Sequence, residues 1–478
     1  VFGAPGNEPL GPVPPGAGFH IVRFEELAAT GQAQPEPHCP PDADDLFTIC
    51  YTSGTTGVPK GAMLTHRNII ANSAGTEHML GITCEDVHIS YLPLAHIYER
   101  TNVTFMTHRG AAVGFYRGEI LELVDDILEL KPTTFCSVPR LLNRIYDKVQ
   151  AGLLESGPVA RWLFSQAQAS KLQALAVGDL SGGTMGSFWE RLVFSKVQAR
   201  LGGRVRFIGT GSSPIAPEVY NFLRCAFPEV HEGYGMTETC CMITMTDHED
   251  PMIGHVGAPV FSCEVKLVDV PEMGYTNADH PHPRGEICVR GPTVFQGYYR
   301  DEAQTQDCLD ADGWFHTGDV GSWIEGGRLK IIDRKKNIFK LSQGEYVAPE
   351  KIENVYARSP FVAQVFVYGD SLQAELVAVV VPDPDHLLPW AQAHGLGGRS
   401  IEELCAHPDV SAAVFESMQR EGKSSKLRGF ENARAIHLEP ELWTVDNGMF
   451  TPTFKLKRPR AKEQYQLDIQ RMYQSLHR

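Results

Sequence analysis

The residue types best suited to chemistry gather in one short segment, Tyr51 to Gly61. It holds hydroxyl side chains, glycines and one lysine, namely Thr52, Ser53, Gly54, Thr55, Thr56, Gly57 and Lys60. Glycine lets backbone N–H groups approach an anion closely, and Ser, Thr and Lys add donors and positive charge. The segment therefore predicts a loop that holds a polyphosphate. The same residues also make an ordinary surface turn. The order is not that of a P-loop, because Pro59 precedes the lysine and Gly61 follows it.

A second chemical motif runs from Gly233 to Thr239. Glycines on both sides of Tyr234 leave the backbone open to a ligand, and the tyrosine ring offers a flat face to a purine. Thr237 adds a hydroxyl, and Glu238 adds a hard oxygen ligand of the kind that Mg²⁺ prefers. An ordinary surface carboxylate is the alternative for Glu238.

Two further positions carry charges that a nucleotide could use. Asp319 ends an apolar segment, where a carboxylate can accept hydrogen bonds from ribose hydroxyls; the alternative is a simple turn residue. Lys455 stands near the C-terminus, and a lysine there can reach a carboxylate and an α-phosphate together. A basic terminal tail is the alternative for Lys455.

Composition limits the classes of protein that fit. The chain has 478 residues, which predicts two or more domains, and 42% of them are hydrophobic, as in globular proteins. The net charge of −15 argues against a general nucleic-acid binder. We find no apolar run of membrane-spanning length and no signal-peptide pattern. The 11 cysteines lack metal-ligand spacing, which favours reduced thiols in the cytosol.

Hydrophobic periodicity predicts the elements that must position these residues. Strands at 46–51, 87–92, 133–138 and 205–210 alternate with helices at 65–80, 120–131, 141–149 and 217–227, which indicates a largely parallel α/β sheet. Short strands are expected from 263 to 332. A smaller α+β segment follows, with a helix at 349–356, strands between 361 and 381, and helices after Ser400. The Ala-rich stretch 151–181 is expected to form an inserted helical arm, and no element is expected before Asp44.

The motifs and their order resemble the adenylate-forming enzymes, the superfamily of acyl-CoA synthetases, luciferases and peptide-synthetase adenylation domains. The stretches Asp312–Lys336 and Leu341–Glu350 resemble long-chain fatty acyl-CoA synthetases, and the likeness covers residues 44–476. The resemblance implies an α/β fold with a large AMP-binding domain of parallel sheets plus a small β subdomain, and a smaller, mobile α+β C-terminal domain. The expected boundaries are a Pro/Gly-rich connecting segment at 1–43, the large domain at 44–335 and the C-terminal domain at 336–478.

The resemblance also assigns roles to individual residues. His96, in Pro93–Arg100, lies in the family's acyl-pocket segment, where a positioning role is expected, and Gly211 and Ser212 lie in the stretch that borders adenine. Tyr234 matches the residue that stacks on adenine, Asp319 the ribose ligand, and Thr237 and Glu238 the motif in which the glutamate holds the metal. Arg334, at the hinge Asp333–Asn337, is expected to contact the nucleotide, and Gly344 is expected beside CoA. Lys455 matches the adenylation lysine by its spacing after Thr453. Lys457 and Arg458 are neighbours with no matching position.

The implied reaction activates long-chain fatty acids with ATP and Mg²⁺ to an acyl-adenylate, which CoA then converts to acyl-CoA. The expected partners are these small molecules, with no nucleic acid. The expected location is the cytosol or the cytosolic face of a membrane such as the endoplasmic reticulum, with peripheral association. One alternative is an acyl-AMP ligase that serves a carrier protein; another is an inactive lipid-binding or interaction protein derived from the enzyme.

One departure concerns the start of the chain. The family has a substantial segment before the phosphate loop, which would also hold any membrane anchor, whereas here residues 1–45 are rich in Pro and Gly. We therefore expect that the chain begins partway through a larger protein. On its own it is expected to be inactive or poorly soluble, because the missing strands would leave apolar surface uncovered.

Overall fold

The computed structural model describes residues 22–52, 59–183, 185–451 and 455–476. The chain divides into an N-terminal unit, Val1–Asp45, and a main unit, Leu46–Arg478. The described part of the N-terminal unit contains one helix, α1 (Phe24–Ala33), with every residue exposed. The expectation that no element precedes Asp44 is therefore wrong. Glu25 and Glu26 in the first turn favour a helix electrostatically, and the Pro/Gly content around them masked that signal.

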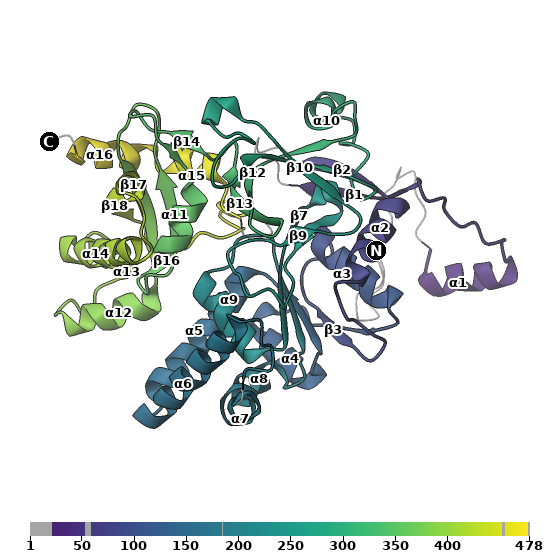
Figure 1. The fold of residues 1–478 in the computed structure, drawn as a ribbon, viewed down its shortest axis with the longest axis horizontal. Coiled ribbons are helices and arrows are strands. Elements are labelled where there is room, and N and C mark those ends of the chain that lie inside the picture. The colour runs from purple at the N-terminus through teal and green to yellow at the C-terminus, as the bar shows by residue number, and fades with distance from the viewer. Residues whose placement is uncertain (1–21, 53–58, 184, 452–454, 477–478) are drawn as a thin grey trace. The chain divides into compact units, whose positions relative to one another are not determined.

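The main unit is built on a large, mostly parallel sheet (Figure 1). Its strand order is β4-β3-β5-β6-β7-β8-β9; neighbours from β4 to β7 are parallel, and β8 and β9 are antiparallel. The strands are β3 (Val87–Ser90), β4 (Ala112–Phe115), β5 (Thr134–Ser137), β6 (Phe207–Thr210), β7 (Glu229–Met236), β8 (Cys241–Met245) and β9 (Ala258–Pro259). This arrangement confirms the predicted α/β architecture.

Helices connect and cover these strands. They are α2 (His66–Glu77), α3 (Ile97–His108), α4 (Leu123–Leu130), α5 (Pro139–Glu155), α6 (Pro158–Leu175), α7 (Gly186–Trp189), α8 (Ser195–Gln198) and α9 (Pro217–Ala226), with a π-helical turn at Glu190–Phe194 and 3₁₀ turns at Ile120–Glu122, Ala199–Leu201 and Thr237–Thr239. Thr65 caps α2 by accepting from the N–H of Asn68, as the sequence predicts, although the helix ends at Glu77 rather than Leu80.

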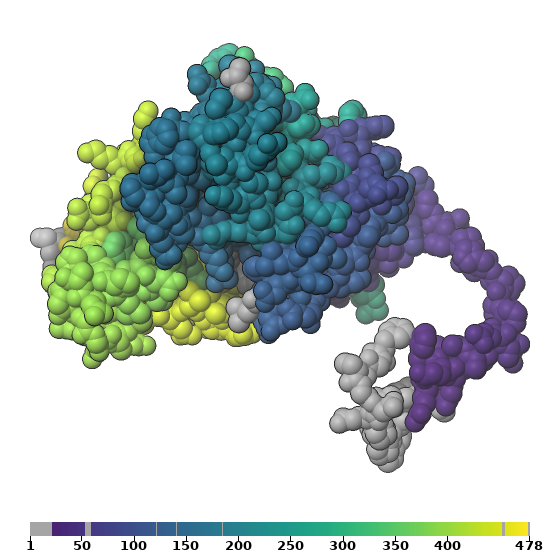
Figure 2. Space-filling model, turned by 90° about the horizontal axis from the view of Figure 1, so that it is seen from below, coloured from purple at the N-terminus to yellow at the C-terminus, as the bar shows by residue number. Residues whose placement is uncertain are grey.

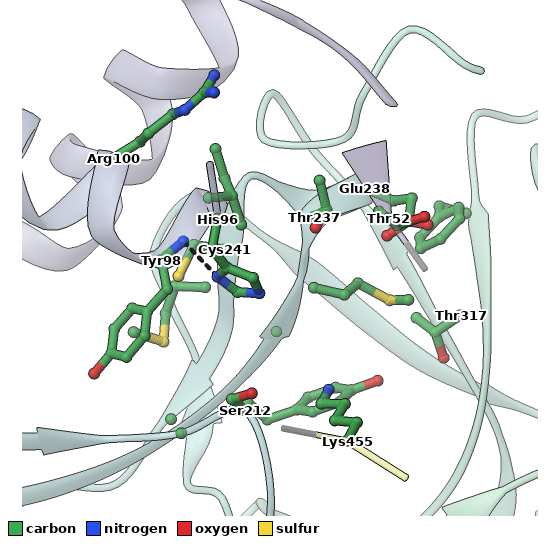
Figure 3. A pocket seen from close by; sticks show the side chains of 18 of the residues that line it. Thr52, His96, Tyr98, Arg100, Ser212, Thr237, Glu238, Cys241, Thr317 and Lys455 are labelled. Atoms are coloured by element: carbon green, nitrogen blue, oxygen red, sulfur yellow. Dashed lines mark hydrogen bonds between the residues drawn. The ribbon is translucent and has the colours of Figure 1, made fainter. Parts of the chain in front are cut away.

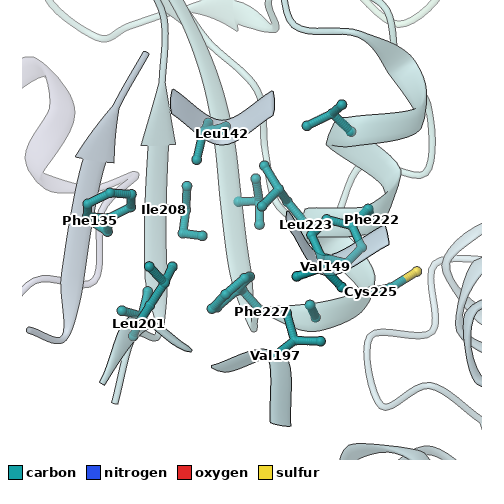
Figure 4. Close-up of a cluster of buried hydrophobic side chains, with 14 of the residues drawn as sticks. Phe135, Leu142, Val149, Val197, Leu201, Ile208, Phe222, Leu223, Cys225 and Phe227 are labelled. Carbon is teal, nitrogen blue, oxygen red and sulfur yellow. The ribbon is translucent and has the colours of Figure 1, made fainter. Parts of the chain in front are cut away.

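The core of this part lies between the sheet and α5, α6 and α9 (Figure 4). Phe135 and Ile208 of the sheet pack with Leu142, Phe222 and Leu223, all of them completely or almost completely buried. Helix α6 contributes the buried residues Phe164, Ala167 and Leu175 to the same core. The predicted arm is therefore an integral part of the domain core, because its alanines allow close helix packing.

Two further sheets are antiparallel. The first contains the strand predicted at 46–51, so its expected place in the parallel sheet is wrong, and the second begins where short strands were expected, from residue 263. Strands β1 (Leu46–Thr52) and β2 (Lys60–Thr65) pair with each other. The second sheet has the order β10-β11-β12-β13, with β10 (Glu264–Val268), β11 (Arg284–Arg290), β12 (Phe315–Ile324) and β13 (Arg328–Arg334); α10 (Glu302–Cys308) and a 3₁₀ turn at Pro271–Met273 lie between these strands. The β12–β13 register places Asp319 opposite Arg334.

The C-terminal part has its own sheet and hydrophobic clusters. Its elements are β14 (Phe339–Lys340), β15 (Tyr346–Val347), α11 (Pro349–Tyr356), β16 (Val362–Tyr368), β17 (Leu376–Pro382), α12 (Pro384–Ala393), α13 (Ile401–Cys405), α14 (Pro408–Ser424), a 3₁₀ turn at Gly429–Glu431, β18 (Ala433–Leu438), α15 (Arg458–Gln464) and α16 (Gln466–Leu476). Strand β17 is buried along its whole length between β16 and β18. These residues, coloured green to yellow, form one continuous surface in Figure 2.

The predicted helix at 349–356 and the strands within 361–381 are present, whereas β18 and α12 were not predicted. All 11 cysteines are free thiols. Within the described ranges, no helix combines the length and apolar character needed to cross a bilayer.

Candidate active site

A cavity of about 970 Å³ opens in the main unit (Figure 3). Many of the sequence-predicted residues line it: Thr52, Lys60, His96, Gly211, Ser212, Tyr234, Thr237, Glu238, Arg334 and Lys455. Figure 3 shows His96, Glu238 and Lys455 reaching the cavity from separate stretches of the chain. Asp319 and Gly344 are not part of its lining. Ser53, Gly54, Thr55, Thr56 and Gly57 lie outside the described residues.

Glu238 is held at the polar end of the cavity by a residue that the sequence did not identify. The hydroxyl of Tyr298 donates to Oε1 of Glu238 over 2.7 Å, and the Lys60 ammonium lies 5.0 Å from the centre of the tyrosine ring. Glu238 is only 6% exposed. Tyr298 therefore fixes one carboxylate oxygen, and no other described residue forms a hydrogen bond with the side chain of Glu238. No spacing signal points to Tyr298, because it lies outside every recognised motif.

Tyr234, Asp319 and Arg334 form a connected group beside the cavity. The Tyr234 hydroxyl donates to Oδ2 of Asp319 over 2.7 Å, and Nε of Arg334 lies 3.3 Å from Oδ1. Burial, followed by the Asp319 charge, raises the pKa of Tyr234 well above its usual value, so the phenol stays protonated. The Asp319 charge is also the main cause of the raised pKa of Arg334. Asp319 thus orients the tyrosine and the arginine that line the cavity.

The glycines around Tyr234 have a packing role as well as bordering the cavity. A Cβ on Gly235 would lie 1.4 Å from the carbonyl oxygen of Cys241, and one on Gly233 would lie 2.8 Å from Sδ of Met242. A Cβ on Gly211 would lie 2.8 Å from the carbonyl oxygen of Gly233. At Gly235 and Gly211 the neighbouring backbone therefore leaves no room for a side chain, and at Gly233 the Met242 side chain would have to move. The prediction that these glycines expose backbone to a ligand describes only part of their function.

His96 forms the N-cap of α3 and faces the cavity. Its Nδ1 accepts a hydrogen bond from the N–H of Tyr98 over 3.1 Å, as the dashed line in Figure 3 shows. Burial, with a smaller contribution from the Lys455 charge, lowers the pKa of His96 to about 4. The imidazole is therefore neutral near pH 7, and because Nδ1 accepts, Nε2 carries the hydrogen. His96 is arranged to donate a hydrogen bond rather than to remove a proton.

Lys455 reaches the cavity from the C-terminal part of the chain. Its backbone is tied to Thr451, whose N–H donates to the carbonyl oxygen of Lys455 over 2.9 Å. Burial, and next the Arg334 charge, lower the pKa of Lys455, whereas Glu350, Asp319 and Glu238 act in the opposite direction. Thr453, on which its prediction rested, lies outside the described residues. Lys457 is not part of the cavity lining, and Arg458 pairs with Glu353.

The other end of the cavity is apolar and was not predicted from the sequence. Its wall includes Leu80, Ile82, Phe105, Met106, Cys136 and Phe207. These residues come from separate helices, loops and strands, so no local pattern could have gathered them. The cavity therefore joins a charged end to a hydrophobic one, as an amphipathic substrate requires.

Gly344 lies in a turn of the C-terminal part, with a φ of +93°, which favours glycine. This structure does not bring it to the cavity. Among the described residues there is no cluster of three His, Cys, Asp or Glu side chains that could hold a metal ion.

Comparisons with known proteins agree with this fold. The model for the AMP-binding enzyme family matches residues 15–299, and that for the AMP-binding enzyme C-terminal domain matches residues 351–420. Among solved structures, the adenylation domain of the carboxylate reductase from Mycobacterium chelonae is 31% identical, with a TM-score of 0.75, over 94% of this chain and 63% of that one.

Two curated relatives are more similar in sequence. The peroxisomal long chain acyl-CoA synthetase 6 of Arabidopsis thaliana is 55% identical over 98% of this chain. The human long-chain-fatty-acid–CoA ligase 1 is 48% identical over 96% of it. The chain spans 66% and 65% of the lengths of these two relatives. With the family model matching most of the sequence, the chain belongs to the AMP-binding enzyme family.

Proposed function

We propose that the protein containing this chain activates long-chain fatty acids to acyl-CoA through an acyl-adenylate, using ATP and releasing AMP and pyrophosphate. One observation carries the proposal: a single cavity joins the cluster around His96, Glu238 and Lys455 to an apolar channel walled by Phe105 and Phe207. The sequence similarity to the two long-chain synthetases supports the same substrate class.

The first step joins the fatty acid to the nucleotide. A carboxylate oxygen attacks the α-phosphorus of ATP, the bond to the bridging oxygen breaks, and pyrophosphate leaves with that oxygen and its electrons. Lys455 and His96 both line the cavity. The Lys455 ammonium would neutralise charge on the carboxylate and the α-phosphate, and the Nε2–H of His96 would donate to the same oxygens. Holding two anions together in this geometry is the largest task of such a site.

The residues fit Mg²⁺ as a companion of ATP. Mg²⁺ commonly binds through one or two carboxylates together with substrate phosphates. Tyr298 holds Oε1 of Glu238, and among the described residues Oε2 has no hydrogen-bond partner, so it could bind the metal. When bound there, Mg²⁺ would neutralise phosphate charge. The segment Thr52–Gly57 and Lys60 would bind the β- and γ-phosphates, and the ring of Tyr234 would stack on adenine.

The second step transfers the acyl group to CoA. The thiolate sulfur attacks the carbonyl carbon of the acyl-adenylate, the bond from that carbon to the phosphate oxygen breaks, and AMP leaves. In this structure Lys455 lines the cavity and Gly344 does not, an arrangement suited to adenylation. Rotation about Asp333–Asn337 would withdraw Lys455 and bring the turn around Gly344 to the site.

The surroundings of the enzyme are also proposals. We infer that its partners are the fatty acid, ATP and CoA, and that nucleic acid is not among them. We propose that the protein lies in the cytosol or peripherally on the cytosolic face of a membrane such as the endoplasmic reticulum.

A second candidate is transfer of the acyl group to a carrier protein instead of CoA. The likeness to the A-PCP didomain of the carboxylic acid reductase from Segniliparus rugosus, in which an adenylation domain is joined to a carrier domain, favours keeping this candidate; the identity is 28% and the TM-score 0.72. It predicts fatty-acid adenylation without thioester formation on free CoA.

The test is product identification with the full-length protein, palmitate, MgATP and CoA. Mass spectrometry should find palmitoyl-CoA and AMP in equal amounts. Accumulation of palmitoyl-adenylate with CoA unchanged would favour the carrier candidate. Formation of ADP rather than AMP would contradict both.

A further inference from the structure

A buried ionisable pair lies behind the cavity wall and has no part in the chemistry described above. His88 on β3 and Glu99 on α3 both have side chains that are 0% exposed, and Nε2 of His88 lies 3.1 Å from Oε1 of Glu99. A carboxylate accepts hydrogen bonds, so Nε2 of His88 carries the hydrogen of this contact. Nδ1 of His88 lies 3.4 Å from the hydroxyl of Thr134 on the neighbouring strand β5, so both ring nitrogens have a polar neighbour that fixes the orientation of the ring.

Stability alone is a poor explanation for such a pair. Bringing two ionisable groups out of water costs several kcal/mol each, and replacing a buried pair with well-packed apolar residues is often neutral or stabilising. The pair instead fixes the position of α3 relative to β3. A directional hydrogen bond holds the helix against the strand at one register, whereas apolar contacts allow small shifts.

The helix that Glu99 anchors forms a long section of the cavity wall. His96 caps its N-terminus, and Tyr98, Asn102, Phe105 and Met106 line the cavity from the charged end toward the apolar end. Glu99 is also linked directly to this wall, because Nδ2 of Asn102 donates to its Oε2 over 3.3 Å. On the other side, the hydroxyl of Tyr98 donates to the carbonyl oxygen of Gly209 over 3.2 Å.

We propose that His88 and Glu99 are positioning residues that set the place of α3 along the cavity, and thereby where the fatty-acid carboxylate stops relative to Lys455. This inference rests on the proposed function. The length of the Glu99 side chain is the determining feature, because it fixes the separation of α3 from β3. The residues proposed to bind adenine, the metal and the nucleotide, namely Tyr234, Glu238 and Arg334, lie on elements other than α3, so we expect ATP binding to change less than the place of the fatty acid.

Two conservative variants of Glu99 in the full-length protein separate length from charge. Glu99→Gln keeps the length and an oxygen that can accept from His88, and its NH₂ group can donate to Asn102 if that amide turns its oxygen inward. We therefore expect kcat/KM for palmitate to fall by less than about threefold. Glu99→Asp keeps the charge but shortens the reach, and a misplacement of about 1 Å can reduce the rate on the order of 100-fold. We therefore expect Glu99→Asp to lose roughly ten- to 100-fold in kcat/KM for palmitate, with KM for ATP changed less than twofold. A larger loss in Glu99→Gln than in Glu99→Asp would overturn the proposal.

The double variant His88→Leu with Glu99→Leu separates positioning from folding. Its melting temperature should stay within a few degrees of the wild type, because the apolar pair leaves no buried charge unpaired. Its kcat/KM for palmitate should nevertheless fall at least tenfold, again with KM for ATP unchanged. If the double variant keeps the wild-type kcat/KM for palmitate, or if its kcat/KM for ATP falls by the same factor, the pair is merely structural.

His255→Leu is the matched control. The side chain of His255 is also 0% exposed and its Nε2 lies 3.4 Å from Oδ2 of Asp250, but neither residue lines the cavity. The His255→Leu variant should have a lower melting temperature than the wild type. Below its own melting temperature, its kcat/KM for palmitate should equal that of the wild type. If the wild-type protein shows no palmitate-dependent activity at all, the proposed function itself fails. If instead the wild type is active and the Glu99 variants are equally active, only the positioning proposal fails.

Discussion

The contact between Tyr298 and Glu238 gives a sharp test of the metal proposal. Tyr298→Phe removes only the hydroxyl that donates to Oε1 of Glu238 over 2.7 Å and keeps the ring beneath Lys60. Loss of a partner that orients a metal ligand typically costs 10- to 100-fold in metal affinity. The buried carboxylate oxygen is also left without its donor, which costs about 1–3 kcal/mol. We therefore expect a Mg²⁺ requirement raised by roughly 10- to 100-fold and a melting temperature lowered by a few degrees.

The assay is fatty-acid-dependent ATP–pyrophosphate exchange as a function of free Mg²⁺. Tyr299→Phe serves as the control, because Tyr299 is 41% exposed and lies beside Arg300 rather than Glu238. Its Mg²⁺ dependence should equal that of the wild type. Identical Mg²⁺ dependence for Tyr298→Phe and Tyr299→Phe would refute the idea that the hydroxyl orients a metal ligand.

Three further changes test other parts of the site. Lys455→Ala should reduce adenylation about 100- to 1000-fold in exchange assays, but thioester formation from supplied acyl-adenylate should be largely retained. Lys457→Ala, the control, should leave both half-reactions unchanged. Unchanged exchange in Lys455→Ala would mean that the lysine is misassigned. Gly235→Ala should strongly lower the melting temperature, because the added Cβ would lie 1.4 Å from the carbonyl oxygen of Cys241, whereas Gly81→Ala, which meets nothing within 4 Å, should not. The pKa of His96 falls from 6.5 in the unfolded chain to about 4 in the folded one, so between pH 4 and 6.5 the unfolded chain binds more protons. The free energy of unfolding should therefore rise with pH across this window. His96→Asn keeps an N-cap acceptor, so in urea unfolding the difference from wild type should change across that window; a constant difference would contradict the pKa assignment.

The parts of the fold that the sequence predicted are those with strong local signals. Thr65 and Asn68 form the cap of α2, and the alternating strands and helices before Tyr234 lead directly to the parallel sheet. Helix α1 escaped prediction because its apolar face, Phe24, Leu27 and Ala28, spans little more than one turn and none of these residues is buried. Strand β18 was missed because Ala433–Leu438 mixes charged and apolar residues, and only its pairing with the buried β17 defines it.

The candidate site divides in the same way. Residues in contiguous motifs, such as Tyr234 and Glu238, could be predicted as neighbours because a few positions of backbone separate them. Tyr298 and the pair His88–Glu99 could not, since their partners are brought together only by tertiary folding. Asp319 shows a further limit: its prediction as a nucleotide residue did not reveal that both its oxygens already bind Tyr234 and Arg334.

The central claim is that one cavity binds ATP at its charged end and a long acyl chain at its apolar end. The most direct test is ATP–pyrophosphate exchange by the full-length protein with a panel of acetate, medium-chain and long-chain fatty acids, amino acids and aryl acids. The account predicts that kcat/KM rises with chain length and is highest for the long-chain acids. Exchange driven best by an amino acid or an aryl acid would contradict it.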